Sequence, residues 1–220
     1  MSRTQYFFWL LLFPITIFSK TEIVPSFVGG IDRSAAEICL KEIDQSQCKL
    51  NTQFTEYKHC VKKVLMKNTA CKQSLAFFSL TDGGIFKKIR SYQNIDVILA
   101  DYVYIADQGT GYFLVTKRGE FISLPIPITK KQLKAMPNYS NIAKQYHRVG
   151  AWQILNFPDG HPLPDKRYRL VFAQQLKDGC NACAIAGKAE VGYDFSLDGT
   201  KFFGIQLLNL YPKQPPQPPI

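Results

Sequence analysis

Apolar and polar residues alternate most regularly near the end of the chain, over 187–208. The alternating apolar residues at the start of this stretch are Val191, Tyr193 and Phe195. The pair Asp198-Gly199 follows them, and it is typical of a tight turn because both residues tolerate a positive φ. An extended apolar pattern resumes at 202. The sequence therefore predicts two strands joined by a turn, a β-hairpin.

Further strands are predicted earlier in the chain. Four short apolar stretches, separated by turn-forming residues, lie at 95–99, 102–105, 112–116 and 121–124. A fifth strand is expected over 167–172, where the residues on one face are Tyr168, Leu170 and Phe172. Short helices are expected after Thr129, which would cap the first, and over 141–148. The pattern indicates an antiparallel sheet of about five to seven strands.

A period of three to four residues predicts helices between 31 and 80. Ser34 and Glu37 have the spacing of a capping box, so we expect the first helix to begin there. The second helix is expected over 52–78, although its apolar stripe weakens at Asn68. The turn-forming stretch 81–84 then ends the helical segment and marks a domain boundary.

Residues 1–19 contain one cation, Arg3, followed by an apolar run over 6–18. This run is shorter than the roughly 20 residues that span a bilayer, and it is typical of a secretory signal peptide. We expect a periplasmic or secreted protein that is not an integral membrane protein after cleavage. The expected organisation is a signal peptide (1–19), a cysteine-rich helical segment (20–80), a sheet domain (81–210) and a proline-rich tail (211–220).

All six cysteines lie after the predicted signal peptide, at Cys39, Cys48, Cys60, Cys71, Cys180 and Cys183. An even number in an exported chain favours disulfides over a metal site. Cys60 and Cys71 would lie on the same face of a continuous helix. We favour instead a nested pairing, Cys48 with Cys60 and Cys39 with Cys71, which requires the first helix to end before Cys48. The predicted fold class is therefore α+β, a disulfide-stapled helical hairpin followed by a mainly antiparallel β-sheet domain.

The formal net charge is +10 at pH 7. The lysines and arginines are spread along the chain rather than gathered in a basic arm, and an exported protein rarely meets nucleic acid. We therefore expect no nucleic-acid partner, and we expect membrane headgroups, cell-wall polymers or an acidic protein surface instead. The lysines of the 52–78 helix could face such a partner.

Cys180 and Cys183 form the most specific motif, C-x-x-C. We interpret the pair as a local disulfide that fixes the entry of the hairpin. The alternative is a thiol–disulfide oxidoreductase, in which such a pair usually opens a helix that lowers the pKa of the first thiol. The flanking residues leave room for one helical turn at most, and no Trp or Pro has the placement usual in thioredoxins.

Two other features are candidate binding residues. The proline-rich stretch 157–164 is predicted to be a loop carrying Asp159 and His161, and loops often hold functional residues. Trp152 is expected to contribute to the core rather than to an exposed platform. No catalytic motif, metal site or cofactor is predicted.

These features favour an exported, non-enzymatic interaction module, such as an accessory subunit of a cell-envelope assembly. One alternative is an inhibitor of an envelope hydrolase that uses the 157–164 loop, and another is the thiol–disulfide oxidoreductase. Residues 188–200 are similar to the hairpin of TonB-type periplasmic C-terminal domains, a resemblance from which no function is carried over.

Overall fold

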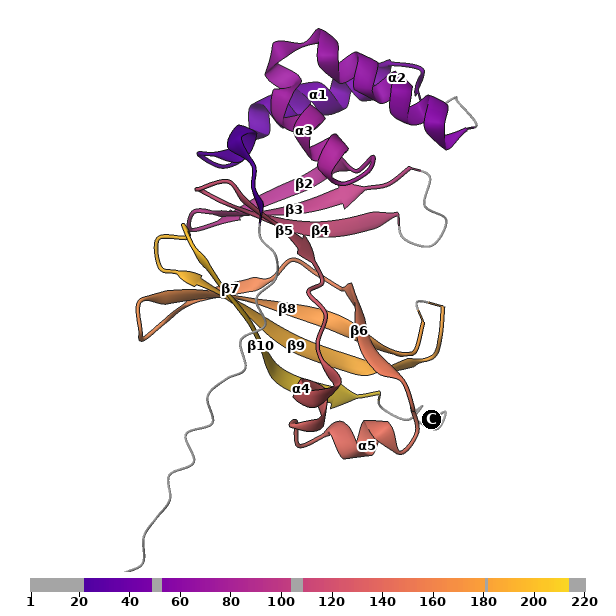
Figure 1. Cartoon of the computed structure of the whole chain (residues 1–220), viewed down its shortest axis with the longest axis vertical. Coiled ribbons are helices and arrows are strands. Elements are labelled where there is room, and N and C mark those ends of the chain that lie inside the picture. Colours follow the sequence, from indigo (N-terminus) through magenta and orange to yellow (C-terminus); the bar gives the residue numbers. More distant parts are fainter. Residues whose placement is uncertain (1–21, 49–52, 104–108, 181, 214–220) are drawn as a thin grey trace, which may run out of the picture.

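The computed structural model describes residues 22–48, 53–103, 109–180 and 182–213 of the chain. They form helices and two mainly antiparallel sheets, so the predicted α+β class is confirmed. The helical region 33–80, the first sheet and the second sheet follow one another from top to bottom in Figure 1, and two short helices lie at the bottom beside the second sheet. The predicted signal peptide and positions 214–220 of the predicted tail lie outside the described residues.

The helical layer contains α1 (Arg33–Gln45), α2 (Phe54–Lys67), the 3-10 helix η3 (Thr69–Cys71) and α3 (Lys72–Leu80). The capping box predicted at Ser34 and Glu37 is wrong. α1 begins at Arg33 because the side chain of Asp32 accepts a hydrogen bond from the amide of Ala35, at 3.0 Å. An aspartate caps a helix as well as a serine does.

Asn68 divides the helix that was predicted over 52–78. Its backbone is extended, with φ −115° and ψ 117°, so it ends α2. Its side chain accepts a hydrogen bond from the amide of Ala70 at 3.0 Å and thereby caps η3. It also donates to the carboxylate of Glu42 at 2.6 Å, which ties this corner to α1. The prediction of one continuous helix is therefore wrong.

The nested disulfides are confirmed. Cys39 of α1 is bonded to Cys71, and Cys48 is bonded to Cys60 of α2. α1 ends at Gln45, before Cys48, as this pairing requires. The two bonds staple the helices around a small apolar core that includes the buried residues Ile43, Tyr57, Val61, Leu65 and Phe78.

The first sheet has the strand order β1-β5-β4-β3-β2. Its strands are β1 (Glu22–Ile23), β2 (Ile85–Tyr92), β3 (Ile95–Asp101), β4 (Thr110–Thr116) and β5 (Glu120–Leu124), with the 3-10 helix η1 (Pro25–Phe27) after β1. Both faces of this sheet are covered. On β3, Val97 packs in the core between the two sheets and Ile98 in the core beneath the helices. This two-sided burial explains why 95–100 is almost continuously apolar.

Two details of the first sheet differ from prediction. β2 was not predicted, because its basic residues Lys87, Lys88 and Arg90 interrupt the apolar pattern. A strand was expected over 102–105, but the described residues Tyr102 and Val103 follow the end of β3 and belong to no strand. The rest of that prediction lies outside the described residues.

Asp96 on β3 fastens the helical layer to the first sheet. Its buried carboxylate accepts hydrogen bonds from the amide of Ile31, at 2.7 Å, and from the hydroxyl of Ser91. Gly30 allows this close approach, because a Cβ there would lie 2.8 Å from the carboxylate and the residue has φ +94°. The chain thus enters α1 already held against the sheet.

The second sheet has the order β10-β9-β8-β6, and β7 also pairs with β8. Its strands are β6 (Val149–Ile154), β7 (Asp159–Leu163), β8 (Arg167–Asp178), β9 (Ile185–Ser196) and β10 (Phe202–Pro212). The predicted hairpin is confirmed as β9 and β10, and β10 continues into the predicted tail. The single sheet that was predicted is in fact two five-stranded sheets, because a two-residue period does not say which sheet a strand joins.

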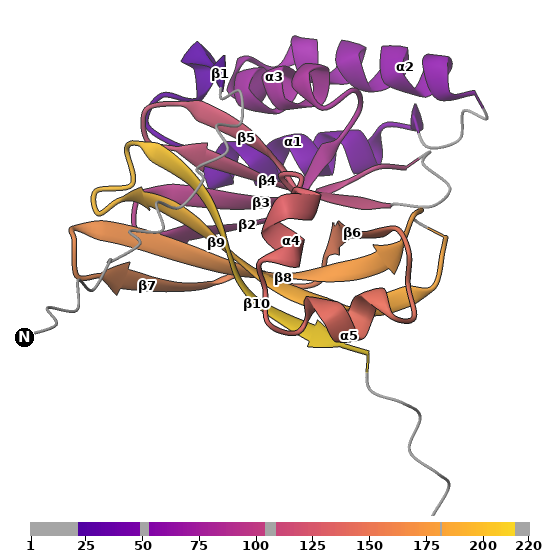
Figure 2. The ribbon, with the colours of Figure 1, turned by 60° about the horizontal axis from the view of Figure 1, so that its bottom comes forward.

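One face of the second sheet packs on the first sheet and on two short helices, α4 (Lys130–Lys134) and α5 (Tyr139–Ala143). Figure 2 shows these helices beside β9 and β10. Thr129 caps α4 as predicted, whereas α5 begins two residues before the expected 141–148 and ends at Ala143. The buried hydroxyl of Tyr193 accepts hydrogen bonds from the amide of Ile126 and the side chain of Gln174, at 3.2 and 2.9 Å.

Candidate functional site

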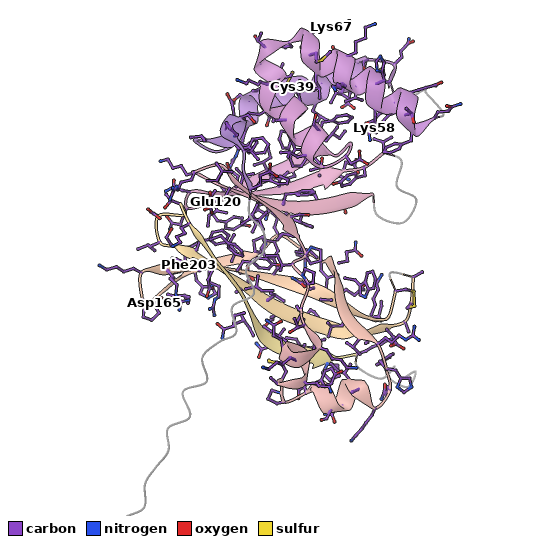
Figure 3. The ribbon with its side chains drawn as sticks, viewed as in Figure 1. Cys39, Lys58, Lys67, Glu120, Asp165 and Phe203 are labelled. Carbon is purple, nitrogen blue, oxygen red and sulfur yellow. A yellow bond between two sulfur atoms is a disulfide. The ribbon has the colours of Figure 1, made fainter. Side chains whose placement is uncertain are left out.

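α2 has one buried face and one cationic face. Its buried residues, Tyr57, Val61 and Leu65, recur every four positions and pack into the small helical core. The lysines lie off this buried face, and Figure 3 shows Lys67 at the top of the helical layer and Lys58 toward the other end of the helix. The apolar stripe that was predicted for this helix is thus present, and the lysines lie outside it.

An open cavity of about 380 Å³ lies between α2 and α3. Its lining residues are Thr55, Lys58, His59 and Lys62 from α2, and Phe78, Ser79 and Asp82 from α3 and the turn that follows. Phe78 is only 4% exposed and belongs to the helical core, so it forms an apolar base. The polar groups surround this base, and we call the whole the α2–α3 cavity.

The cations of the α2–α3 cavity are not equally available. Lys58 forms an ion pair with Asp82, and its ammonium lies 4.9 Å from the centre of the Phe54 ring. Among the residues that the structure describes, Lys62 and His59 have no ion-pair partner. Lys62 therefore supplies an uncompensated positive charge, and the imidazole of His59 supplies a further hydrogen-bonding group beside it.

Such a site suits an anionic group. Ammonium, imidazole and hydroxyl groups all hydrogen-bond to carboxylate or phosphate oxygens. Cys60, next to His59, is bonded to Cys48 and is not a free ligand for a metal. Within the described ranges, no three His, Cys, Asp or Glu side chains are placed to hold a metal ion.

The helices that form the α2–α3 cavity are fixed covalently. The Cys48–Cys60 bond holds the middle of α2, and the Cys39–Cys71 bond holds the start of α3. The Cα atoms are 5.5 Å apart in both bonds. A cavity whose walls are fixed in advance loses less conformational entropy when a partner binds.

The predicted binding loop over 157–164 is for the most part a strand. β7 pairs with β8, and His161 lies opposite Arg169. Asp159 and His161 are both exposed and lie on the same face, since they are two residues apart on the strand. The loop prediction is wrong because Pro162 suggested irregular structure, whereas an edge strand tolerates proline.

Trp152 is neither fully in the core nor on an open platform. It lies on β6, partly buried, at a register shift where β6 pairs with β8. It lines a small cavity of about 40 Å³ at the seam of the two sheets, together with Tyr112 and Pro125. The structure thus places Trp152 and the pair Asp159 and His161 on separate strands, β6 and β7, along the same edge of β8.

Arg169, opposite His161, belongs to an ion-pair network that sequence reasoning missed. Its guanidinium donates to both carboxylate oxygens of Asp194, at 2.5 and 2.7 Å, and to Gln206 at 2.8 Å. The side chain crosses Gly192, where a Cβ would lie 2.8 Å from its Cδ. Because Arg169 donates three hydrogen bonds within this network, we interpret the network as structural.

Cys180 and Cys183 are joined by a disulfide. They lie in the connection between β8 and β9, where the amide of Cys183 donates to the carbonyl of Cys180 at 3.2 Å. The described residues around the pair begin no helix, so no helix N-terminus is available to lower the pKa of a thiol. This geometry favours a local staple, and the oxidoreductase hypothesis stays a prediction.

Sequence reasoning recognised the lysine-rich helix but not the cavity beside it. Ser79 and Asp82 reach the cavity from α3 and the next turn, more than fifteen positions from the lysines. Only the packing of α3 against α2 brings them together. The signal that could have suggested it was the nested disulfide, which folds the chain back at η3.

Comparisons with protein-family models, with curated proteins and with solved structures found no match to this chain. The α2–α3 cavity is therefore interpreted from its own geometry.

Proposed function

We propose that this protein is an exported, non-enzymatic interaction module, and that the α2–α3 cavity binds an acidic segment of a protein partner. An accessory subunit of a cell-envelope assembly would have this role. The observation that carries the proposal is the uncompensated Lys62 beside His59 in an open cavity with an apolar base. The net charge of +10 favours the approach of an acidic partner.

The shape of the site supports a protein partner over a flat anionic surface. A cavity of about 380 Å³ can take a protruding carboxylate side chain, whose methylene groups would contact Phe78. Lipid headgroups would reach mainly the outermost lysines of α2. A protruding acidic side chain therefore uses both the charge and the apolar base.

The disulfides support the proposed location. All six cysteines are paired, which is compatible with an extracellular or periplasmic protein. Within the described residues, no helix combines the length and the apolar character needed to cross a membrane.

A pair of neighbouring lysines provides a matched test. Lys62 lines the cavity, whereas Lys63 is exposed on the same helix and does not line it. The partner is first recovered by mild crosslinking and then purified. We expect Lys62→Glu to weaken binding to this partner by about tenfold or more. Lys63→Glu carries the same change of charge and should weaken binding much less.

Three outcomes would count against the proposal. Equal loss of binding in both variants would point to a diffuse electrostatic surface rather than a cavity. Unchanged binding in both variants would remove α2 from the interface. Binding of acidic vesicles that depends on Lys62 as strongly as partner binding does would replace the protein partner with a membrane surface.

A further inference from the structure

β2 is an edge strand with a free side. Among the described residues it pairs only with β3, so one side of β2 has backbone N–H and C=O groups without a strand partner. Such an edge is a template on which another extended segment can add as a strand.

A helix runs beside this edge for most of its length. Arg33, at the start of α1, donates to the hydroxyl of Ser91 at 2.5 Å, near the end of β2. The other half of α1 lies near the start of β2, where Leu40, Ile43 and Ile85 line a common small cavity. α1 and β2 are therefore roughly antiparallel, and they form the two walls of a groove.

The groove contains open space and has an apolar floor. A cavity of about 180 Å³ lies between the two elements, and its apolar lining residues are Ala36, Leu40, Phe86 and Ile89. Every second side chain of an added strand would point toward the helix and could contact this floor. A groove between an edge strand and a helix is suited to recognition by strand addition.

The charges around the groove select the occupant. The charged residues that line the groove are Arg33, Lys87, Lys88 and Glu37. Lys87 also pairs with Asp101 at 3.7 Å, and the cationic groups of Lys88 and Arg90 lie over the ring of Phe157. Exposed lysines on an edge strand also oppose unwanted pairing. In the lining itself three cations face one carboxylate, and this surplus of positive charge favours extended segments that carry Asp or Glu.

Two other occupants fit the charges less well. A second copy of the chain, paired edge to edge, would bring the basic residues of β2 close to the same residues of its partner. The predicted proline-rich tail, 211–220, has no acidic residue and carries Lys213. Its prolines also lack the N–H groups that strand pairing needs.

We infer that the groove between α1 and β2 binds an extended, acidic segment of another protein, which adds to the first sheet as a strand next to β2. This surface shares no lining residue with the α2–α3 cavity, so the two proposals can fail independently. The protein would then contact acidic partner segments at two sites.

A labelled peptide of alternating Val and Glu tests this inference by fluorescence anisotropy. We expect it to bind the full chain, and we expect a Val and Lys peptide of equal length not to bind. In the Lys87→Glu/Lys88→Glu variant, affinity for the acidic peptide should fall by about tenfold or more. The control variant, Lys117→Glu/Arg118→Glu, changes the charge equally in the exposed turn between β4 and β5 and should bind as the wild type does.

Backbone pairing is tested separately by hydrogen exchange. The acidic peptide should slow the exchange of amides on β2, and the same peptide with alternate amides N-methylated should not. Unchanged exchange on β2, equal affinity for the methylated peptide, or equal loss in the control variant would each overturn the inference. Dimerisation of the free chain that is abolished by Lys87→Glu/Lys88→Glu would assign the groove to a second copy instead.

Discussion

The helical layer and the second sheet are stabilised in different ways. The helices surround a small core, and two disulfides connect them across 32 and 12 positions of sequence. The second sheet consists largely of long strands joined to their sequence neighbours, and it shares the largest core with the first sheet. Its disulfide closes a connection of 3 positions. The layer that carries the cationic cavity is thus the one that depends most on covalent links.

This difference follows from the surfaces that each region exposes. α2 carries lysines around most of its surface and can bury only a narrow apolar stripe. The strands β8 and β9 bury one face over most of their length. The buried residues of this face include Leu170 and Phe172 on β8 and Val191, Tyr193 and Phe195 on β9. Small apolar cores are commonly supplemented by disulfides. The helices can therefore present charge on a rigid frame.

The largest expected effect is the loss of the long disulfide. Loop entropy predicts that Cys39→Ala/Cys71→Ala lowers the free energy of unfolding by about 4 kcal/mol, since the bond closes 32 positions. For Cys180→Ala/Cys183→Ala, with 3 positions, the loss should stay below about 2 kcal/mol. Urea unfolding of both variants measures the difference. Equal losses would show that the helical layer does not depend on its staple in the way proposed.

The nested pairing could be predicted because cysteine spacing restricts which partners can meet. The β9–β10 hairpin could be predicted because Asp198-Gly199 encodes its turn locally. The division into two sheets could not be predicted, because it depends on the packing of strands that are far apart in the sequence. β2 was missed for a related reason: its lysines are compatible with a strand only at an edge, and edge position is a property of the whole fold.

A buried hydroxyl in the second sheet should have the next largest effect. Tyr193→Phe leaves the amide of Ile126 and the side chain of Gln174 without their acceptor, which should cost about 2 kcal/mol. Thermal unfolding measures this loss. Tyr112→Phe, on a tyrosine that has ring contacts with Phe157 and Phe172, should cost less, and a larger loss there would contradict this account.

The same tyrosine predicts a dependence on pH. Burial raises the pKa of Tyr193 well above its usual value of 10.0, and the hydrogen bonds from Ile126 and Gln174 oppose this rise only in part. Because the pKa is higher in the folded state, the stabilisation is complete below pH 10 and is lost as the pH rises above that value. Wild-type protein should therefore lose more stability above pH 10 than Tyr193→Phe does. If the free energy of unfolding changes with pH in the same way in the wild type and in Tyr193→Phe, this prediction is wrong.

A glycine under Arg169 should have a smaller effect. Gly192→Ala places a methyl group 2.8 Å from Cδ of Arg169, so the guanidinium must move away from Asp194 and Gln206. We expect a loss of about 1 kcal/mol, because the flexible side chain can partly adapt. In the Arg169→Ala background the clash is absent, and the cost of Gly192→Ala should fall. An unchanged cost in that background would exclude the clash as its cause.

The central claim is that an acidic partner enters the cavity between α2 and α3. A photo-crosslinking amino acid at position 62 tests this claim in cells that produce the protein, and another at the exposed position 130 of α4 serves as the control. We predict a discrete adduct from position 62 alone, joined to a segment rich in Asp and Glu. Adducts of the same pattern from both positions, or none from position 62, would contradict the account.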